Sequence, residues 1–207
     1  YETIFYKLLP SRLKELDPAR PYWPSSPAAG YKDVLSLTSG DYHYWDIVKE
    51  DLPISVYNDN VGRFMSEYGF KSYPQEKTLR AYSEEKDWNI RSEVMESHQG
   101  WPTGADLVER TMEREYGKPA NFLAFQYVSA LLQAEAIGIA IEAHRRAKPR
   151  CWGSLYWQLN DCWPCASWSS VDFLGNWKAL HYKVCNVFKP ILVSVIEENG
   201  KTDVHIV

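Results

Sequence analysis

The sequence predicts an α/β fold, half of a (β/α)8 TIM barrel, because short apolar strand patterns alternate with helical patterns along the chain. Polar and aromatic residues also gather directly after each strand pattern. In parallel barrels these strand ends meet at the face that holds the active site. A doubly wound sheet fits the same alternation less closely. Only about four strand patterns precede residue 190, which is too few for a whole barrel.

The helical patterns divide the chain into segments. Apolar residues recur at helical spacing over residues 2–16, and Asp17-Pro18 ends that pattern. The clearest helix is predicted over residues 120–147, where an apolar stripe steps by three or four residues until Pro149. Three shorter helices are predicted over residues 76–90, over residues 103–116 with Thr103 as the N-cap, and over residues 176–188.

Four strand patterns lie between these helices: "RPYWPSSP", "VLSLTSGDYHYWD", "RFMSEYG" and "CWGSLYWQLN". The pattern changes after Lys189-Pro190, where two β-branched runs flank "EENGK". That stretch contains the Asn-Gly signal of a β-hairpin. We therefore predict two domains, a partial barrel over residues 1–189 and the start of an all-β domain over residues 190–207.

Composition excludes several classes of protein. The 207 residues are 45% hydrophobic and 24% charged, with a net charge of −4, which describes a globular chain and disfavours nucleic acid as a partner. No run of ~18 uninterrupted apolar residues occurs, so no membrane partner is expected. Cys162 and Cys165 have C-x-x-C spacing, but a second ligand pair is missing, so free thiols and no metal site are expected. No cofactor is expected, and the sequence assigns no compartment.

Aromatic residues are 14% of the chain, and many fall in loop-like stretches: "GDYHYWD", "HQGWPTG" and "LYWQLNDCWPCASW". Sugar rings have apolar faces that stack on aromatic side chains, whereas their hydroxyl groups need polar neighbours. The aromatic set therefore predicts a carbohydrate-binding cleft. For any single Trp, packing in the core remains the alternative.

A carboxylate interrupts the apolar run "FMSEYGF" at Glu67. As an isolated feature, Glu67 could be a surface residue or a partner of Arg63. At the end of a buried strand that faces aromatic loops, it could instead attack the anomeric carbon of a sugar and form a covalent glycosyl-enzyme. Such a retaining reaction needs a second carboxyl group as acid/base, about 5–5.5 Å away.

The motifs "RFMSEYGFKSYPQ", "DPARPYWPSSP", "GDYHYW" and "GSLYWQLNDCWPCASWSSVDFLGNWKALHY" together resemble the β-mannosidases of glycoside hydrolase family 2. The resemblance covers essentially the whole chain. It implies a large enzyme whose (β/α)8 barrel is followed by immunoglobulin-like β domains. Residues 1–189 would supply about strands 5–8. The implied reaction removes terminal non-reducing β-D-mannose from a β-mannoside oligosaccharide or a glycoprotein-derived glycan, and the rest of the polypeptide is an implied partner.

The resemblance also implies roles for particular residues. Glu67, in Ser-Glu-Tyr-Gly, matches the nucleophile motif. Residues matching the family's loops after strands 6, 7 and 8 are expected to contact the sugar: His43, Trp45, His98, Trp157, Asn160 and Asp161. Asp161 could instead only cap its loop, and the role of His98 is less defined. The family's acid/base Glu follows an Asn, and no Asn-Glu pair occurs in this sequence.

Lys71 stands where the family usually has Gln, and we expect its side chain to face solvent without effect. Facing inward, its ammonium group could lower the pKa of the nucleophile. Three other functions are open: β-galactosidase, β-glucuronidase, or a carbohydrate-binding fragment with no activity of its own. The "WQLND" strand and the "SSVDFLGNWKALHY" stretch favour β-mannosidase.

Overall fold

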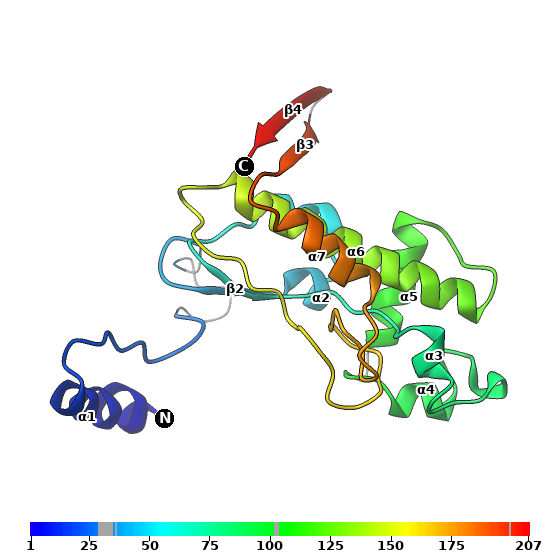
Figure 1. Ribbon diagram of the computed structural model, residues 1–207, viewed down its shortest axis with the longest axis horizontal. Helices are drawn as coiled ribbons and strands as arrows, with labels where there is room; N and C mark the ends of the chain where they lie inside the picture. Colours follow the sequence, from blue (N-terminus) through cyan, green and yellow to red (C-terminus); the bar gives the residue numbers. More distant parts are fainter. Residues whose placement is uncertain (29–34, 36, 102–103, 199) are drawn as a thin grey trace.

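The structure is a computed structural model that describes residues 1–28, 35, 37–101, 104–198 and 200–207. The chain begins with a π-helical turn, η1 (Thr3–Leu8), which continues into α1 (Leu9–Leu16). None of the residues in these two elements is buried. Figure 1 shows this segment extending away from the other elements. The predicted helix over residues 2–16 is confirmed.

Parallel strands lie at the centre of the structure. β1 (Tyr42–Tyr44) pairs in parallel with β2 (Met65–Tyr68). On the other side of β2, residues 152–157 run in the same direction: Met65 N donates to the carbonyl of Gly153, and Trp157 N donates to that of Tyr68. β2 therefore has parallel neighbours on both sides, as the predicted α/β class requires.

The predicted strand "RPYWPSSP" does not form, and residues 21–28 are irregular. Pro21, Pro24 and Pro27 lack the backbone N–H that a strand uses for pairing, which explains this difference. The pattern "CWGSLYWQLN" forms one bridge to β2, at Ser154, and otherwise follows β2 through separate hydrogen bonds.

Several short helices follow the first strand along the chain. In sequence order, the helices between β1 and the long helix α6 are α2 (Asp46–Lys49), the 3-10 helix η2 (Ile54–Asn58), α3 (Glu76–Leu79), the 3-10 helix η3 (Glu85–Asp87), α4 (Glu93–Ser97) and α5 (Gly104–Glu115). The predicted helix over residues 76–90 is therefore two short helices. The helix predicted over residues 103–116 is confirmed as α5, and its proposed cap, Thr103, lies outside the described residues.

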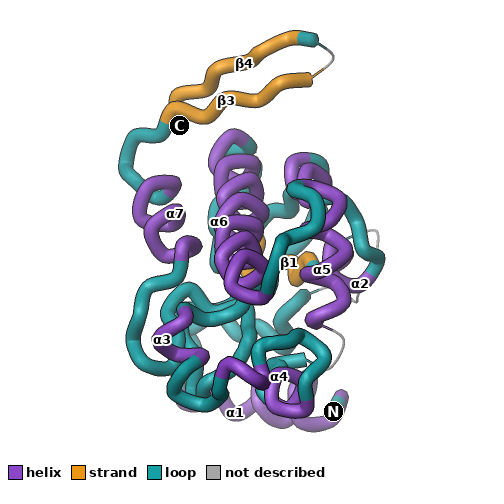
Figure 2. Tube along the Cα trace, turned by 90° about the vertical axis from the view of Figure 1, so that its right-hand side faces the viewer, coloured by secondary structure: helices purple, strands orange, loops and turns teal. Residues whose placement is uncertain are grey.

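The longest helix is α6 (Phe122–Arg146), close to its predicted range, and α7 (Ala179–Val187) packs beside it (Figure 2). By length and composition α6 could cross a membrane. In this fold its buried face is that of a core helix with polar contacts: Gln133 donates to the carbonyls of Phe70 and Ser169 and accepts from Ser72.

The chain ends in a hairpin of β3 (Val193–Glu198) and β4 (Lys201–Ile206), which pair in antiparallel register as a separate two-stranded sheet. The predicted hairpin is confirmed, although Asn199 of its turn lies outside the described residues. Arg145 of α6 holds the base of the hairpin, because its guanidinium group donates to the carbonyls of Val187, Lys189, Pro190 and Val207.

Candidate active site

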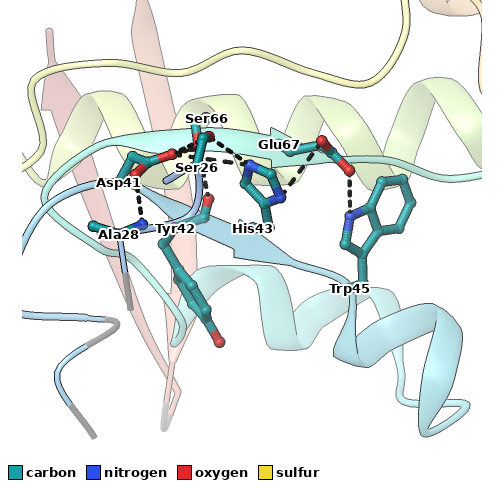
Figure 3. Close-up of polar contacts among 8 residues, drawn as sticks. All are labelled: Ser26, Ala28, Asp41, Tyr42, His43, Trp45, Ser66 and Glu67. Carbon is teal, nitrogen blue, oxygen red and sulfur yellow. Dashed lines mark hydrogen bonds and ion pairs between the residues drawn. The ribbon is translucent and has the colours of Figure 1, made fainter. Parts of the chain in front are cut away.

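Glu67 lies near the carboxyl end of β2, directly opposite His43 of β1. The indole Nε1 of Trp45 donates to Glu67 Oε1 at 2.8 Å, and His43 Nδ1 lies 3.5 Å from Glu67 Oε2 (Figure 3). Each carboxylate oxygen thus has its own neighbour. The Glu67 side chain is 24% exposed. The two strands therefore hold a partly accessible carboxylate in one orientation.

The other ring nitrogen of His43 faces a second carboxylate. His43 Nε2 lies 3.8 Å from Asp41 Oδ2 and 3.0 Å from the hydroxyl of Ser26. Figure 3 shows the imidazole of His43 between Asp41 and Glu67. This arrangement fixes the plane of the ring, so it positions the nitrogen that faces Glu67.

Asp41 is itself held by several donors. The hydroxyls of Ser26 and Ser66 donate to Asp41 Oδ2 at 2.6 Å, and the backbone N–H of Ala28 donates to Oδ1 at 2.8 Å. Burial raises the pKa of Asp41, but these hydrogen bonds favour the ionised form more strongly and leave the pKa below its usual value. Asp41 is therefore a fixed anion behind His43.

A cavity of about 490 Å³ opens beside Glu67. Four tryptophans give the cavity largely apolar walls, and among the described residues Glu67 supplies its carboxylate. The described lining residues are Trp45, Val48, Lys49, Glu67, Trp101, Trp157 and Trp168. The rings of Trp45 and Trp168 meet edge to face, with centroids 6.0 Å apart. Apolar walls around one anionic group are suited to a sugar ring.

Gly69 allows this cavity to form. A Cβ atom at this position would collide with the carbonyl of Trp157 and with the ring of Trp45, and it would crowd the ring of Trp168. The glycine two residues after Glu67 therefore lets three cavity-lining residues approach the backbone of the strand.

Trp157 is placed by the strand pairing beside β2, through its N–H bond to the carbonyl of Tyr68 at 2.7 Å. The following peptide bond, to Gln158, is cis. Trp157 remains 46% exposed on the cavity wall. The predicted set Glu67, His43, Trp45 and Trp157 is thus brought together.

Asn160 and Asp161 do not line this cavity. Asn160 is exposed and donates to the carbonyl of Asp161. The Asp161 side chain is buried, and its two oxygens accept from the hydroxyls of Ser167 and Ser169 at 2.6 and 2.7 Å. For Asp161 this geometry favours the alternative of a loop cap.

His98 also lies outside the cavity lining. Its ring stacks between Tyr82, at 4.1 Å, and Trp163, at 5.3 Å. Its Nδ1 lies 2.5 Å from the carbonyl of Pro164. In the described residues His98 therefore joins two loops and has no contact with Glu67.

The expectation that Lys71 faces solvent is wrong. Its side chain is buried, with 1% exposed, and Nζ donates to Gln99 Oε1 at 2.5 Å and to the carbonyl of Trp101 at 3.2 Å. The start of α5 covers it, since a Cβ atom on Gly104 would overlap its Nζ. Desolvation lowers the pKa of Lys71 to about 7.

Three residues of the site were not singled out from the sequence. Trp101 and Trp168 lie in aromatic stretches noted for their composition, but composition does not tell which rings face a cavity. Asp41 directly precedes the strand that carries His43. In the described part of the chain, no group of three His, Cys, Asp or Glu side chains could hold a metal ion.

No protein-family model matches the chain. Sequence comparison finds the β-mannosidase of Bos taurus, 32% identical over 93% of this chain, and β-mannosidase B of Aspergillus flavus, 31% identical over 95%. The chain spans about a quarter of the length of these curated relatives, 24% in each case.

Solved structures give the same result. The β-D-mannosidase of Dictyoglomus thermophilum is 35% identical, with a TM-score of 0.94, and the match covers 100% of this chain and 25% of that one. An exo-chitosanase of Amycolatopsis orientalis is 19% identical with a TM-score of 0.70, which shows a shared fold alone. These relatives belong to the glycosidases. Among glycosidases, the chain is similar over nearly its whole length to a segment of β-mannosidases, which confirms the resemblance carried by the sequence motifs.

Proposed function

We propose that this chain supplies half of the catalytic centre of a retaining exo-β-mannosidase, with Glu67 as the nucleophile. The observation that carries the proposal is the position of Glu67, which is held by Trp45 and His43 at a strand end on a tryptophan-lined cavity. Glu67 attacks the anomeric carbon of the terminal mannose, and the aglycone departs with a proton from an acid. Water then releases the sugar from Glu67.

The acid/base residue lies on another segment of the polypeptide. Asp41 is a second carboxylate that faces His43, but it is a poor acid. Both of its oxygens already accept hydrogen bonds, and its pKa stays below the usual value despite the opposing effect of burial. His43 also stands between it and Glu67. Asp41 therefore serves to position His43.

The remaining cavity residues bind the sugar. Trp45 orients the nucleophile through its indole N–H, and Trp157 offers an exposed ring face to the apolar side of mannose. Outside the cavity, Asn160, exposed on the loop after residue 157, contacts hydroxyl groups of a bound glycan. Asp161 supports that loop, and His98 connects it to α4.

At the domain level, we infer that residues 1–189 form about strands 5–8 of a (β/α)8 barrel with their helices. The parallel neighbours of β2 and the cavity at its carboxyl end support this assignment. Residues 190–207 begin an immunoglobulin-like β domain, an assignment that their separate antiparallel sheet supports. The substrate is a β-mannoside oligosaccharide or a glycoprotein-derived glycan.

The test is the replacement Glu67→Gln in the full-length polypeptide that contains these residues. Because Gln keeps the shape of the side chain but cannot attack, kcat on p-nitrophenyl β-mannoside should fall by roughly 10³-fold or more, with the melting temperature unchanged. A 2-deoxy-2-fluoro-β-mannosyl fluoride should label Glu67 of the wild type.

Glu96→Gln, at an exposed position of α4, is the matched control and should retain full activity. Labelling of another residue, or an active Glu67→Gln variant, would remove Glu67 from this role. Preferential turnover of a β-galactoside or a β-glucuronide would favour those activities instead.

A further inference from the structure

Lys71 is a buried cation with no described acidic partner. No carboxylate among the described residues forms an ion pair with it, and its hydrogen bonds go to the side-chain oxygen of Gln99 and the carbonyl of Trp101. The titratable groups that interact with it electrostatically are the thiol of Cys165 and the ammonium group of Lys178. Gly104, at the positive N-terminal end of α5, also packs against it. An ammonium group is expensive to keep in such a place.

The contacts of Lys71 converge on one wall of the cavity beside Glu67. One hydrogen bond holds the carbonyl of Trp101, and Nζ lies 5.9 Å from the ring centroid of Trp168, within the range of a cation–π contact. Trp101 and Trp168 both line the cavity. Lys71 itself is absent from the lining, so it lies behind this wall.

The backbone connects the same groups. Gly100 N donates to the carbonyl of Ala166, and Gln99 pairs with Ala166 in a parallel bridge. The segments that carry Trp101 and Trp168 are therefore joined next to the Gln99 side chain, which Lys71 holds. Loss of the ammonium group would weaken the bond to Gln99, the bond to Trp101 and the attraction to Trp168 together.

We propose that Lys71 is a positioning residue whose ammonium group sets the Trp101–Trp168 wall of the cavity, so that its protonation state controls sugar binding. This inference deepens the proposed function and rests on it for the identity of the ligand. It assigns Lys71 no contact with the sugar. Burial lowers the pKa of Lys71 to about 7, so its protonation state changes near neutral pH. The wall is ordered below that pH, where Lys71 is charged, and loosened above it.

The first experiment reads the wall without any ligand. The full-length polypeptide is labelled with 5-fluorotryptophan, and the ¹⁹F resonance of residue 168 is identified by its absence in Trp168→Phe. In wild type this resonance should shift with pH, with a midpoint near 7. In Lys71→Met, which keeps the length of the side chain but removes its charge and donors, it should be insensitive to pH.

Lys178→Met is the matched control, because the pKa of Lys178 is lowered to about 8 by burial and that group could produce a similar titration. The titration should persist in Lys178→Met, at a somewhat higher pH because a neighbouring positive charge is gone. A wild-type resonance that does not titrate, or one that titrates equally in Lys71→Met, overturns the inference.

The second experiment measures binding of mannoimidazole by calorimetry at several pH values. Below pH 7, wild type should bind roughly five- to tenfold more tightly than Lys71→Met, and the two affinities should converge above pH 8. Equal affinities at every pH contradict the inference. If mannoimidazole binds neither protein while the fluorine titration is present, the proposed function fails and the role of Lys71 in the wall stands.

Discussion

The two polar neighbours of the Glu67 carboxylate come from a stretch of only three residues, His43 to Trp45. His43 is in β1 and faces Glu67 across the parallel pairing, and Trp45 follows the end of β1 and reaches back to the same carboxylate. Behind them Asp41 is held by two serine hydroxyls and a backbone N–H. Asp41 restricts the rotation of His43, and His43 and Trp45 restrict that of Glu67. Preorganisation of this kind lowers the cost of aligning a nucleophile.

The replacement Trp45→Phe tests this arrangement because it retains an aromatic ring but removes the N–H that donates to Glu67. A hydrogen bond to a charged group is lost, so kcat/KM of the full-length polypeptide should fall roughly ten- to hundredfold. Steady-state kinetics with p-nitrophenyl β-mannoside measure the effect. Trp152→Phe, at a position that is 71% exposed, is the control and should change neither kcat nor KM. Unchanged kinetics in Trp45→Phe would show that the indole N–H has no catalytic role.

At the scale of elements, the sequence specified the long helix better than the short ones. The apolar stripe of α6 runs along most of this 25-residue helix, so its range could be predicted closely. The helix predicted over residues 76–90 breaks because side chains bond locally to the backbone: Ser83 donates to the carbonyl of Leu79, and Glu84 and Asp87 form a capping box around η3. Such bonds are not visible in a hydrophobic pattern.

Some residues of the candidate site could also be predicted from the sequence, and others could not. Glu67, His43, Trp45 and Trp157 could be named because each belongs to a motif that resembles the β-mannosidases. The burial of Lys71 could not, since it depends on the packing of α5 over a residue distant in sequence. The burial of Asp161 could not be predicted either, because its hydrogen bonds to Ser167 and Ser169 depend on how the loop folds back on itself.

His144 of α6 makes the stability of this element depend on pH. Its side chain is buried, its Nδ1 lies 2.8 Å from the hydroxyl of Ser154, and its Nε2 has no partner among the described residues. Desolvation lowers its pKa to about 3 from an ordinary value of 6.5. Between these values the unfolded chain binds a proton that the folded chain does not, so stability falls as the pH drops from 6.5 towards 3.

His144→Gln should remove this dependence, because Gln does not titrate. Between pH 6.5 and 5 the wild type should lose about 2 kcal/mol of stability relative to the variant. Melting temperatures of the two full-length proteins over this range measure the difference. Parallel melting curves would mean that His144 becomes protonated in the folded protein. His205→Gln, on the hairpin, is a suitable control.

At the scale of the whole molecule, apolar surface is exposed at both ends of the described chain. On the hairpin, Val193 pairs with Ile206 and Val195 with Val204, and all four side chains are more than half exposed. Several large apolar side chains of η1 and α1 are exposed as well. Patches of this kind are typical of surfaces that contact another domain. They agree with the proposal that the rest of a longer polypeptide packs here.

The isolated 207-residue chain should therefore not hydrolyse p-nitrophenyl β-mannoside. Retaining cleavage takes one carboxyl group to attack and another to protonate the leaving oxygen. In the described residues the cavity presents Glu67 alone, and Asp41 is turned towards His43. Glu2, at the other end of the chain, directly precedes the exposed helix η1, away from β2.

An assay of the purified chain beside the full-length polypeptide, at equal molar concentration, tests this expectation. Circular dichroism supplies the control for folding, because α6 and its neighbours should give a clear helical signal if the chain folds. Addition of the missing part of the polypeptide as a separate chain should restore some activity, since the second carboxyl group then reaches the cavity. Turnover by the 207-residue chain within tenfold of the full-length protein would place the acid/base residue inside this sequence and refute the division of the catalytic pair.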